Sequence, residues 1–351
     1  MTIHKPTHRS GIALVIVMIC IAVLSILAAA FAFSMKVETK LAQNANSETE
    51  LLWMGLSGVE YARWVLVQQT TVAEERGFDA LNQFWASGDT TSVSNSPFQG
   101  MSLSGYPLGN GHFSIKIIDL ERKMNINAAD MRFLQNAFNV VGVDAGESSQ
   151  ITSAIIDWID TNDDRGANGA EDDDYMALDP PYHCKNKPID DMAELLLIRG
   201  ITPDMYWGGV ATNHPPSKFQ SRLSARRGFT GQNMFRVGLK DIFTPISSGK
   251  ININTASAEV LLTIPMMDEN TVSEIIRLRS EMPFHRLNDL GSLGMNSQVL
   301  QQISQNLTVQ STAFEVQVDA EVAGYHRQYT AIVGRDLRDP RKAVVLTFSW
   351  K

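Results

Sequence analysis

The feature that most constrains this fold is an uncharged apolar run near the N-terminus. The residues from Ile12 to Met35 include no Asp, Glu, Lys or Arg. A helix rises about 1.5 Å per residue, so this run is long enough to cross a hydrocarbon core of about 30 Å. The preceding residues are basic, and such a flank stays on the cytoplasmic side of a membrane. The sequence therefore predicts a single-pass membrane protein whose C-terminal part lies across the membrane.

The residues around the start of the run leave three kinds of N-terminus open, one of which is an ordinary basic flank that happens to end in glycine. The short basic leader contains His4, Lys5, His8 and Arg9 and ends at Gly11. Its order resembles the leader of type IV prepilins and pseudopilins, which implies cleavage between Gly11 and Ile12 and retention of the apolar helix. A further alternative is a conventional signal peptide cut after the alanines at 28–30. The length of the run, which continues into a helical pattern, favours the retained helix.

Beyond the membrane, apolar residues recur at helical spacing from Lys36 to about Gln69, and no proline interrupts residues 12–69. We therefore expect one long helix over 12–69, of which 12–35 spans the membrane. Residues 70–111 are rich in Ser, Thr, Gly and Asn and predict loops, with one short helix around Phe78 to Trp85.

Alternating residues predict four strands in two distant parts of the chain. The first runs from His112 to Ile118, and the others cover Phe314–Val322, Gln328–Gly334 and Ala343–Trp350. A long helix followed by a small antiparallel sheet gives an α+β fold. The sheet-forming head would comprise 70–122 and 310–351, after a leader at 1–11.

The intervening residues, 123–309, are helical in pattern and contain an internal repeat. Asn125 and Asn127 open one copy within Lys123–Ala129, and Asn252 and Asn254 open the other within Lys250–Ala256. Two related helical modules, at about 123–215 and 250–309, are therefore inserted in one sheet. We interpret these asparagines as helix caps, since their side-chain oxygens can accept hydrogen bonds from unpaired backbone N–H groups.

The acidic character of the chain is local. The net charge is −8, and eight acids with one arginine lie between Asp157 and Asp174. Asp160, Asn162, Asp164 and Glu171 match positions 1, 3, 5 and 12 of a calcium loop, and Asp172, Asp173 and Asp174 add further oxygen ligands. Arg165 stands where an EF-hand has glycine, so the loop is not an EF-hand. From the residues alone, a calcium site and a solvated acidic loop both remain open.

The leader ending at Gly11, the paired N-I-N boxes and the acidic insert together resemble the type II secretion system protein K family. The resemblance covers nearly the whole chain. It implies a type IV pilin-like fold with a large inserted α-helical domain of two SAM-like modules. It also implies structural calcium in the acidic insert, which favours that interpretation over a solvated loop.

The same resemblance implies a function. Members of this family are minor pseudopilins at the tip of the periplasmic pseudopilus, where they initiate and cap assembly and support protein export across the outer membrane. The implied location is the bacterial inner membrane, with the C-terminal domain in the periplasm. The implied partners are other minor pseudopilins in a heterotrimeric tip complex, the major pseudopilin, prepilin peptidase and the inner-membrane secretion platform. Most pilins carry Glu at the fifth mature position, which here is Ile16. The family lacks that Glu, so the departure supports the resemblance.

Two functions of other classes compete with this one. A membrane-tethered DNA-uptake protein is suggested by the box at Asn252–Ala256, which helix-hairpin-helix proteins share, but the net charge and the turn at Ile264–Asp268 argue against nucleic acid. A membrane-anchored hydrolase lacks a partner group for its acids. The seven histidines show no HExxH pattern and no paired zinc spacing, so we expect no enzyme activity.

The leader generates a prediction about processing. Protein isolated from the membrane should begin at Ile12, with the methylated amine that the resemblance implies. Mass spectrometry of the N-terminal peptide measures this directly. A start near Phe31 would instead mean conventional signal cleavage and loss of the membrane helix.

Overall fold

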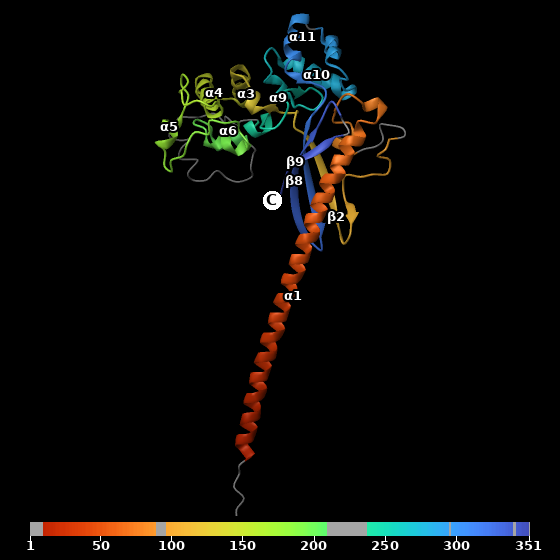
Figure 1. Cartoon of the computed structure of the whole chain (residues 1–351), viewed down its shortest axis with the longest axis vertical. Coiled ribbons are helices and arrows are strands. Elements are labelled where there is room, and N and C mark those ends of the chain that lie inside the picture. The colour runs from red at the N-terminus through yellow and green to blue at the C-terminus, as the bar shows by residue number, and fades with distance from the viewer. Residues whose placement is uncertain (1–9, 89–95, 209–236, 295, 340–341, 351) are drawn as a thin grey trace, which may run out of the picture.

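The computed structural model describes residues 10–88, 96–208, 237–294, 296–339 and 342–350. Its longest element is α1, one helix from Ser10 to Gln69 whose lower half projects from the head as a stalk (Figure 1). The prediction of an uninterrupted helix ending near Gln69 is confirmed. The four basic residues of the leader lie outside the described residues.

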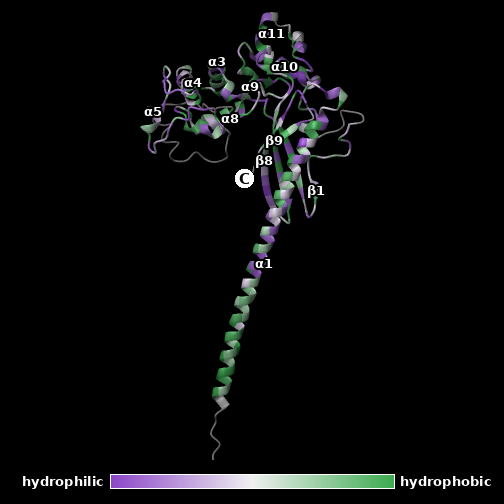
Figure 2. Cartoon of the chain, in the orientation of Figure 1, coloured by the Kyte–Doolittle hydropathy of each residue, from purple (hydrophilic) through white to green (hydrophobic). Residues whose placement is uncertain are grey.

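The stalk carries the apolar run. Every side chain from Ile12 to Asn46 is exposed, and Ser47 is the first buried one. Figure 2 shows hydrophobic residues all around the lower part of α1, whereas the head alternates between hydrophobic and hydrophilic residues. Among the described residues, α1 is the one helix long and apolar enough to cross a bilayer by length and composition.

The head is built on a five-stranded antiparallel sheet. Its order is β1-β2-β7-β8-β9, from the strands Tyr106–Leu108, Gly111–Asp119, Ala313–Val322, Tyr325–Arg335 and Ala343–Trp350. The four predicted strands are confirmed. The three-residue β1 was not predicted, because its exposed residues and Pro107 give no alternating pattern.

The helix expected around Phe78 to Trp85 is wrong in extent. The structure has a 3-10 turn, η1 (Ala73–Glu75), and a short α2 (Phe84–Ser87). Between them the backbone is bonded elsewhere, since Asp79 N donates to the Val309 carbonyl at 2.7 Å. Tertiary contact with the end of the insertion has replaced the local helix.

Two glycines let α1 lie directly on the sheet. A Cβ at Gly55 would lie 2.5 Å from Cδ2 of Tyr329, and one at Gly58 would lie 2.5 Å from Cγ1 of Val318. The inward side chains of β2, β7 and β8 meet α1 in one core that includes Leu51, Val59, Leu66, Phe113, Ile115, Val316, Val318 and Val333. This close approach fixes the stalk to the head.

The helical insertion leaves the sheet after β2 and returns to it at β7. Its first part contains β3 (Met124–Asn125), η2 (Ile126–Ala128), α3 (Met131–Val141), α4 (Ala145–Ile159), α5 (Asp172–Met176), η3 (Met192–Leu197), α6 (Pro203–Trp207), α8 (Leu239–Ile242) and β4 (Phe243–Thr244). Its second part contains β5 (Ile251–Asn252), α9 (Ala258–Leu262), α10 (Glu269–Glu281), η4 (Leu287–Leu293), α11 (Ser297–Ser304) and β6 (Leu307–Thr308). The second part lies at the end of the head away from the stalk, and the first part projects to one side near that end (Figure 1).

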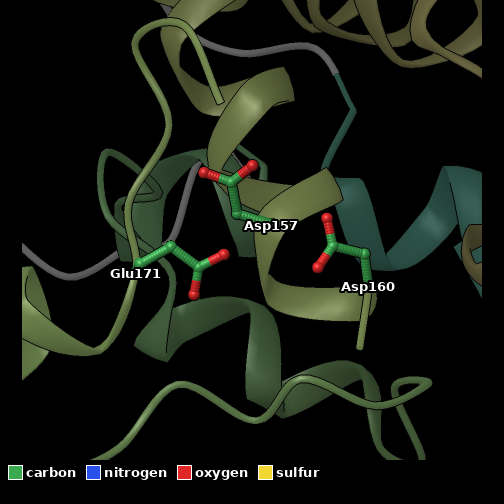
Figure 3. Close-up of side chains that lie close together, drawn as sticks. All are labelled: Asp157, Asp160 and Glu171. Carbon is green, nitrogen blue, oxygen red and sulfur yellow. The ribbon is translucent and has the colours of Figure 1, made fainter. Parts of the chain in front are cut away.

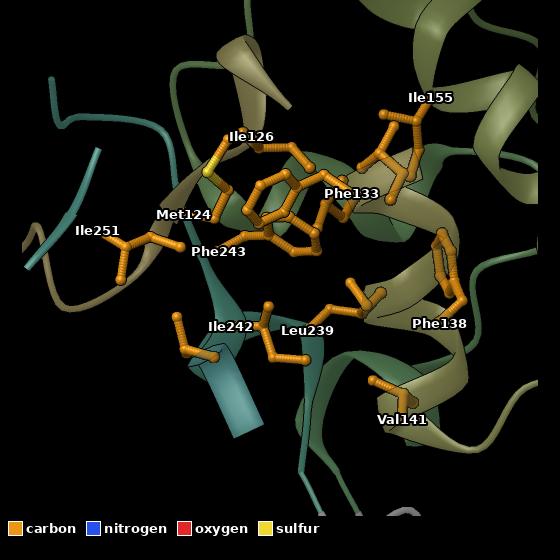
Figure 4. Close-up of a cluster of buried hydrophobic side chains, with 14 of the residues drawn as sticks. Met124, Ile126, Phe133, Phe138, Val141, Ile155, Leu239, Ile242, Phe243 and Ile251 are labelled. Atoms are coloured by element: carbon orange, nitrogen blue, oxygen red, sulfur yellow. The ribbon is translucent and has the colours of Figure 1, made fainter. Parts of the chain in front are cut away.

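Each module is closed by a two-residue parallel pair of strands. β3 pairs with β4 in the first module, and β5 pairs with β6 in the second. The first module therefore continues past residue 215, to Thr244. One apolar cluster spans both modules, and Figure 4 shows Ile251 of the second beside Met124 and Phe243 of the first.

The first asparagine of each repeat bonds to the backbone two residues on. The side-chain oxygen of Asn125 accepts a hydrogen bond from Asn127 N at 2.9 Å, and that of Asn252 accepts from Asn254 N at 3.0 Å. Each bond holds the turn that follows the short strand. The helix-capping prediction is confirmed for Asn125, which is the N-cap of η2, whereas Asn252 holds a turn that is not continued by a helix.

For the second asparagine of each repeat, the capping prediction is wrong. Asn127 Oδ1 accepts from Ile189 N at 2.7 Å and Nδ2 donates to its carbonyl at 2.9 Å. Asn254 makes the same two bonds to Phe284, both at 2.9 Å. Each side-chain amide forms a pair of hydrogen bonds with a distant backbone residue, as a neighbouring strand would, and so joins the two halves of its module; we call this pair of bonds the asparagine clasp. The α3 and α9 helices are capped instead by Asp130 and Ser257.

A buried polar network joins the head to the insertion. Asp119 at the end of β2 accepts hydrogen bonds through Oδ2 from Asn252 Nδ2 at 3.1 Å and Thr255 Oγ1 at 2.5 Å. Asn252 Nδ2 also lies 3.1 Å from the Asp79 carbonyl and 2.8 Å from Ser311 Oγ. Burial, together with the nearby carboxylate of Glu121, raises the pKa of Asp119 to about 7.

The second half of this network is an ion pair. Arg335 at the end of β8 donates to Asp79, and both side chains are almost fully buried. Arg335 also donates to the Ser311 carbonyl at 2.7 Å, while Ser311 N donates to Asp79 Oδ2 at 2.8 Å. Because every partner is bonded, the charges can remain buried between the two cores.

The close contact between α1 and the sheet generates a stability prediction. An exposed helix usually gains about 1 kcal/mol from Gly→Ala, but Gly58→Ala should destabilise the head by about 1–3 kcal/mol because the new methyl overlaps Val318. Thermal unfolding of the purified chain followed by circular dichroism measures the change. Ser57→Ala, one residue along the same helix, is the matched control and should not lower the melting temperature. A more stable Gly58→Ala variant would contradict the close approach.

Candidate metal centre

Three carboxylates meet where the acidic insert begins and ends. Asp157 lies in the last turn of α4, Asp160 follows that helix and Glu171 precedes α5. One oxygen of each lies within 4.8 Å of the others, and in the described part of the chain no other such set of three His, Cys, Asp or Glu residues is found. Figure 3 shows the three side chains directed toward a common space between helix and loop.

Asp157 is held by a glycine-lined turn. It is 3% exposed, and Gly166 N lies 3.3 and 3.2 Å from its two oxygens. A Cβ at Gly169 would lie 1.7 Å from Oδ2, and one at Gly166 would lie 2.8 Å from Oδ1. Only a chain without side chains at these positions can wrap the carboxylate. Burial raises the pKa of Asp157, which marks the cost of keeping it charged.

Glu171 is the strongest sign that a cation belongs here. Its side chain is 4% exposed, and neither carboxylate oxygen has a hydrogen-bond partner in the described structure. Burial, then the charges of Asp157 and Asp160, raise the pKa of Glu171 to about 6, and the nearby Cys184 thiol offsets this only in part. A buried carboxylate without partners is costly beside two others unless a positive ion neutralises it.

The predicted ligand set is only partly gathered. Positions 1 and 12 of the expected loop, Asp160 and Glu171, come together as predicted. Asn162 and Asp164 are exposed, and the oxygen of Asn162 accepts a hydrogen bond from Asp164 N at 2.7 Å. These two residues shape the loop and do not join the cluster of carboxylates.

The three aspartates after Glu171 also lie outside the cluster. Asp172 accepts from Cys184 N at 2.8 Å and its other oxygen lies 2.8 Å from His183 Nδ1. Asp174 pairs with Arg199 at 2.9 Å, and Asp173 is exposed. The bond to His183 lowers the pKa of Asp172, as a partnered carboxylate requires.

The sequence prediction missed Asp157. It precedes Asp160 by three residues, and residues three apart share one helix face. Because α4 continues to Ile159, this helical period was the signal that could have added Asp157 to the set. The three-carboxylate centre is all oxygen, which suits a hard cation such as Ca²⁺. Asp157, Asp160 and Glu171 would hold such an ion, and its charge would offset theirs.

Several known proteins are similar to parts of this chain. The family profile described as type II secretion system (T2SS), protein K matches residues 112–207, and a helix-hairpin-helix motif matches 247–308. The type II secretion system protein K of Pectobacterium carotovorum is 25% identical over 227 residues, which cover 57% of this chain and 69% of that protein. The protein of the same name from Klebsiella pneumoniae is 26% identical over 213 residues, covering 57% of this chain and 60% of the relative.

A solved structure matches the fold as a whole. It is the crystal structure of the GspK-GspI-GspJ complex from the enterotoxigenic Escherichia coli type 2 secretion system, with a TM-score of 0.63 and 17% identity. The match covers 88% of this chain and 99% of the other. The chain is similar to type II secretion system protein K in sequence over residues 112–207, and to a solved GspK complex in fold over most of its length. The pilin-like fold with its long N-terminal helix, expected from the resemblance, is confirmed.

The metal centre generates a prediction about stability. Chelation of divalent cations should lower the melting temperature of the purified chain, and Ca²⁺ should restore it. An ion at a hundredfold excess over its Kd stabilises the folded form by about 2.7 kcal/mol. Glu171→Gln should raise the melting temperature in chelator, because the neutral amide lacks the charge that burial disfavours, and it should abolish the calcium response.

Asp173→Asn is the matched control for this experiment. It removes one charge from the same acidic run without touching the cluster, so its calcium response should equal that of the unmodified chain. An unchanged melting temperature in chelator, or a full calcium response in Glu171→Gln, would contradict the assignment.

Proposed function

We propose that the chain is a minor pseudopilin that occupies the tip of a type II secretion pseudopilus, where it initiates and caps assembly in support of protein export. The observation that carries the proposal is the position of the insertion. The second helical module lies at the end of the head opposite the stalk, where a further subunit along the same axis would have to sit, and the first module projects to one side of that end (Figure 1). So large an addition at that end disfavours stacking of identical copies and favours a single terminal place.

Ile16 supports the same position. It lies in the exposed apolar part of α1, at the place where most pilins carry a glutamate. In an apolar bundle of helices, that glutamate would neutralise the amino terminus of the subunit ahead, because an unpaired charge there is costly. A subunit with isoleucine offers no such partner, so nothing needs to sit ahead of it.

The proposed partners are two smaller minor pseudopilins and, below them, the major pseudopilin. The matched solved structure is a complex of GspK with GspI and GspJ, which supports a heterotrimeric tip in this protein as well. Prepilin peptidase and the inner-membrane platform complete the proposed set. The proposed orientation places the head in the periplasm, with α1 anchored in the inner membrane.

We propose a structural role for the metal centre and no enzymatic role for the chain. A calcium ion held by Asp157, Asp160 and Glu171 would close the long loop of the first module by neutralising its buried charges. Cys184 is buried, and burial raises the pKa of its thiol to about 12, which argues against a nucleophile. The neighbouring His183 bonds to Asp172 through Nδ1.

The helix-hairpin-helix match raises DNA binding as a second candidate. The turn between α9 and α10 has no glycine, and it ends at Asp268, which accepts a hydrogen bond from Thr271 N at 2.7 Å. A carboxylate at this helix start occupies the place that a DNA phosphate would need. We therefore propose that the second module binds protein or its neighbour module and not nucleic acid. A mobility shift of duplex DNA by the purified chain would favour the alternative.

The proposed position predicts how many copies a pseudopilus carries. Antibody against the insertion should label isolated pseudopili once, at one end, while antibody against the major pseudopilin labels the whole shaft as a control. The chain should also co-purify with the two smaller minor pseudopilins of the same organism. Labels spaced along the shaft would contradict a terminal position, and normal secretion in a strain lacking the chain would contradict a role in export.

A further inference from the structure

Within the described residues, α1 packs on one face of the sheet and no helix packs on the outward face of β7. The side chains of Val316, Val318 and Val322 point into the core beneath α1, so the intervening residues of β7 lie on the opposite face. Glu321 is one of these, and it stands near the end of the sheet where α1 enters the head. Tyr325 shows this location, because its hydroxyl donates a hydrogen bond to Asn44 of α1. His326, which pairs with Glu321, is the next residue along β8.

Two histidines flank Glu321 in one row across three strands. His112 of β2 pairs in register with Glu321 of β7, and Glu321 pairs in turn with His326 of β8. Residues directly opposite one another in adjacent strands share a face, so the backbone alone aligns the three side chains. Since the two histidines are far apart in the chain, no spacing rule in the sequence could reveal this row.

The imidazole nitrogens approach the same carboxylate oxygen. His112 Nε2 lies 3.3 Å and His326 Nε2 lies 3.6 Å from Glu321 Oε2. In the described part of the chain, neither imidazole has another polar partner, and no Lys or Arg pairs with Glu321. The histidine side chains are 49% and 60% exposed, so ion pairs alone would contribute little to stability.

Two imidazoles and one carboxylate are a ligand set that Zn²⁺ prefers. Bonds of about 2.0–2.2 Å in a tetrahedral site place neighbouring ligand atoms about 3.3–3.5 Å apart, close to both distances here. The three atoms do not all lie within 4.8 Å of one another, so the two exposed imidazoles must turn toward each other to share an ion. Their exposure leaves room for that rotation.

We propose that His112, Glu321 and His326 bind a zinc ion on the open face of the sheet, with water as the fourth ligand. The ion would tie β2, β7 and β8 together at the end of the head nearest the stalk. This site differs in chemistry from the acidic centre of the insertion, which offers only oxygen. Nitrogen ligands select Zn²⁺ and similar ions over Ca²⁺, so the two sites would sort the two metals.

The test is a calorimetric titration of the full chain in detergent with Zn²⁺. Saturating Ca²⁺ keeps the acidic centre filled, the affinity tag contains no histidine, and His4 and His8 of the leader are replaced by alanine in every sample. We expect one zinc ion per chain. His112→Ala and His326→Ala should each weaken binding at least about tenfold, since even removal of an outer-shell contact to a metal ligand costs that much.

His183→Ala is the matched control, because that histidine is also exposed and also lies beside a carboxylate, Asp172. Its zinc affinity should stay within about twofold of the parent. Circular dichroism verifies that each variant is folded. Binding that survives either His112→Ala or His326→Ala, binding lost in His183→Ala, or no binding below millimolar zinc would each overturn the proposal.

Discussion

The structure depends on a small set of buried polar groups between two hydrophobic cores. The head packs around α1, and the insertion packs around its own apolar cluster, so neither core extends across the junction. Asn252 sits in the gap and bonds at once to Asp119 of the sheet, to Ser311 and to the Asp79 backbone. Hydrogen bonds are directional, whereas apolar contact tolerates sliding. The network therefore fixes the angle between the insertion and the sheet in a way that burial alone would not.

Both modules have the same asparagine clasp, but the length of chain between its two bonded residues differs. The asparagine clasp joins positions 62 residues apart in the first module and 30 residues apart in the second. The acidic loop occupies much of the extra length in the first module. The loop contributes few residues to the apolar cluster, among them Ala170, Tyr175 and Cys184, which gives a physical reason for the added three-carboxylate centre and the glycines around Asp157.

Local patterns in the sequence predicted the elements that are themselves local. The absence of proline predicts α1, and alternation predicts β2, β7, β8 and β9, because each pattern lies within the element it describes. The two-residue strands that close the modules are too short to carry any period. Asparagine is a residue type typical of helix caps, but the side chains of Asn127 and Asn254 bond to residues that lie tens of positions away. Nothing in the sequence reveals these distant partners.

The candidate metal site shows the same division. The spacing of Asp160 and Glu171 predicted correctly that these two carboxylates lie close together, because the calcium-loop pattern is contained in one short segment. Asp172 and Asp174 had the right chemistry but were taken by His183 and Arg199, whose proximity comes only from the fold. A ligand set predicted from charge and spacing therefore included Asp172 and Asp174, which have other partners, and omitted Asp157.

The exposed segment of α1 between the apolar run and the head determines the distance between the head and the bilayer. With Ile12–Met35 in the hydrocarbon, the exposed helix from Lys36 to Asn46 spans about 16 Å. The headgroup layer takes up about 5–7 Å of that length on one side of the membrane. The remaining space, about 10 Å, is the width of a single helix. A neighbouring head can fit beneath this one only after α1 has been drawn part of the way out of the lipid.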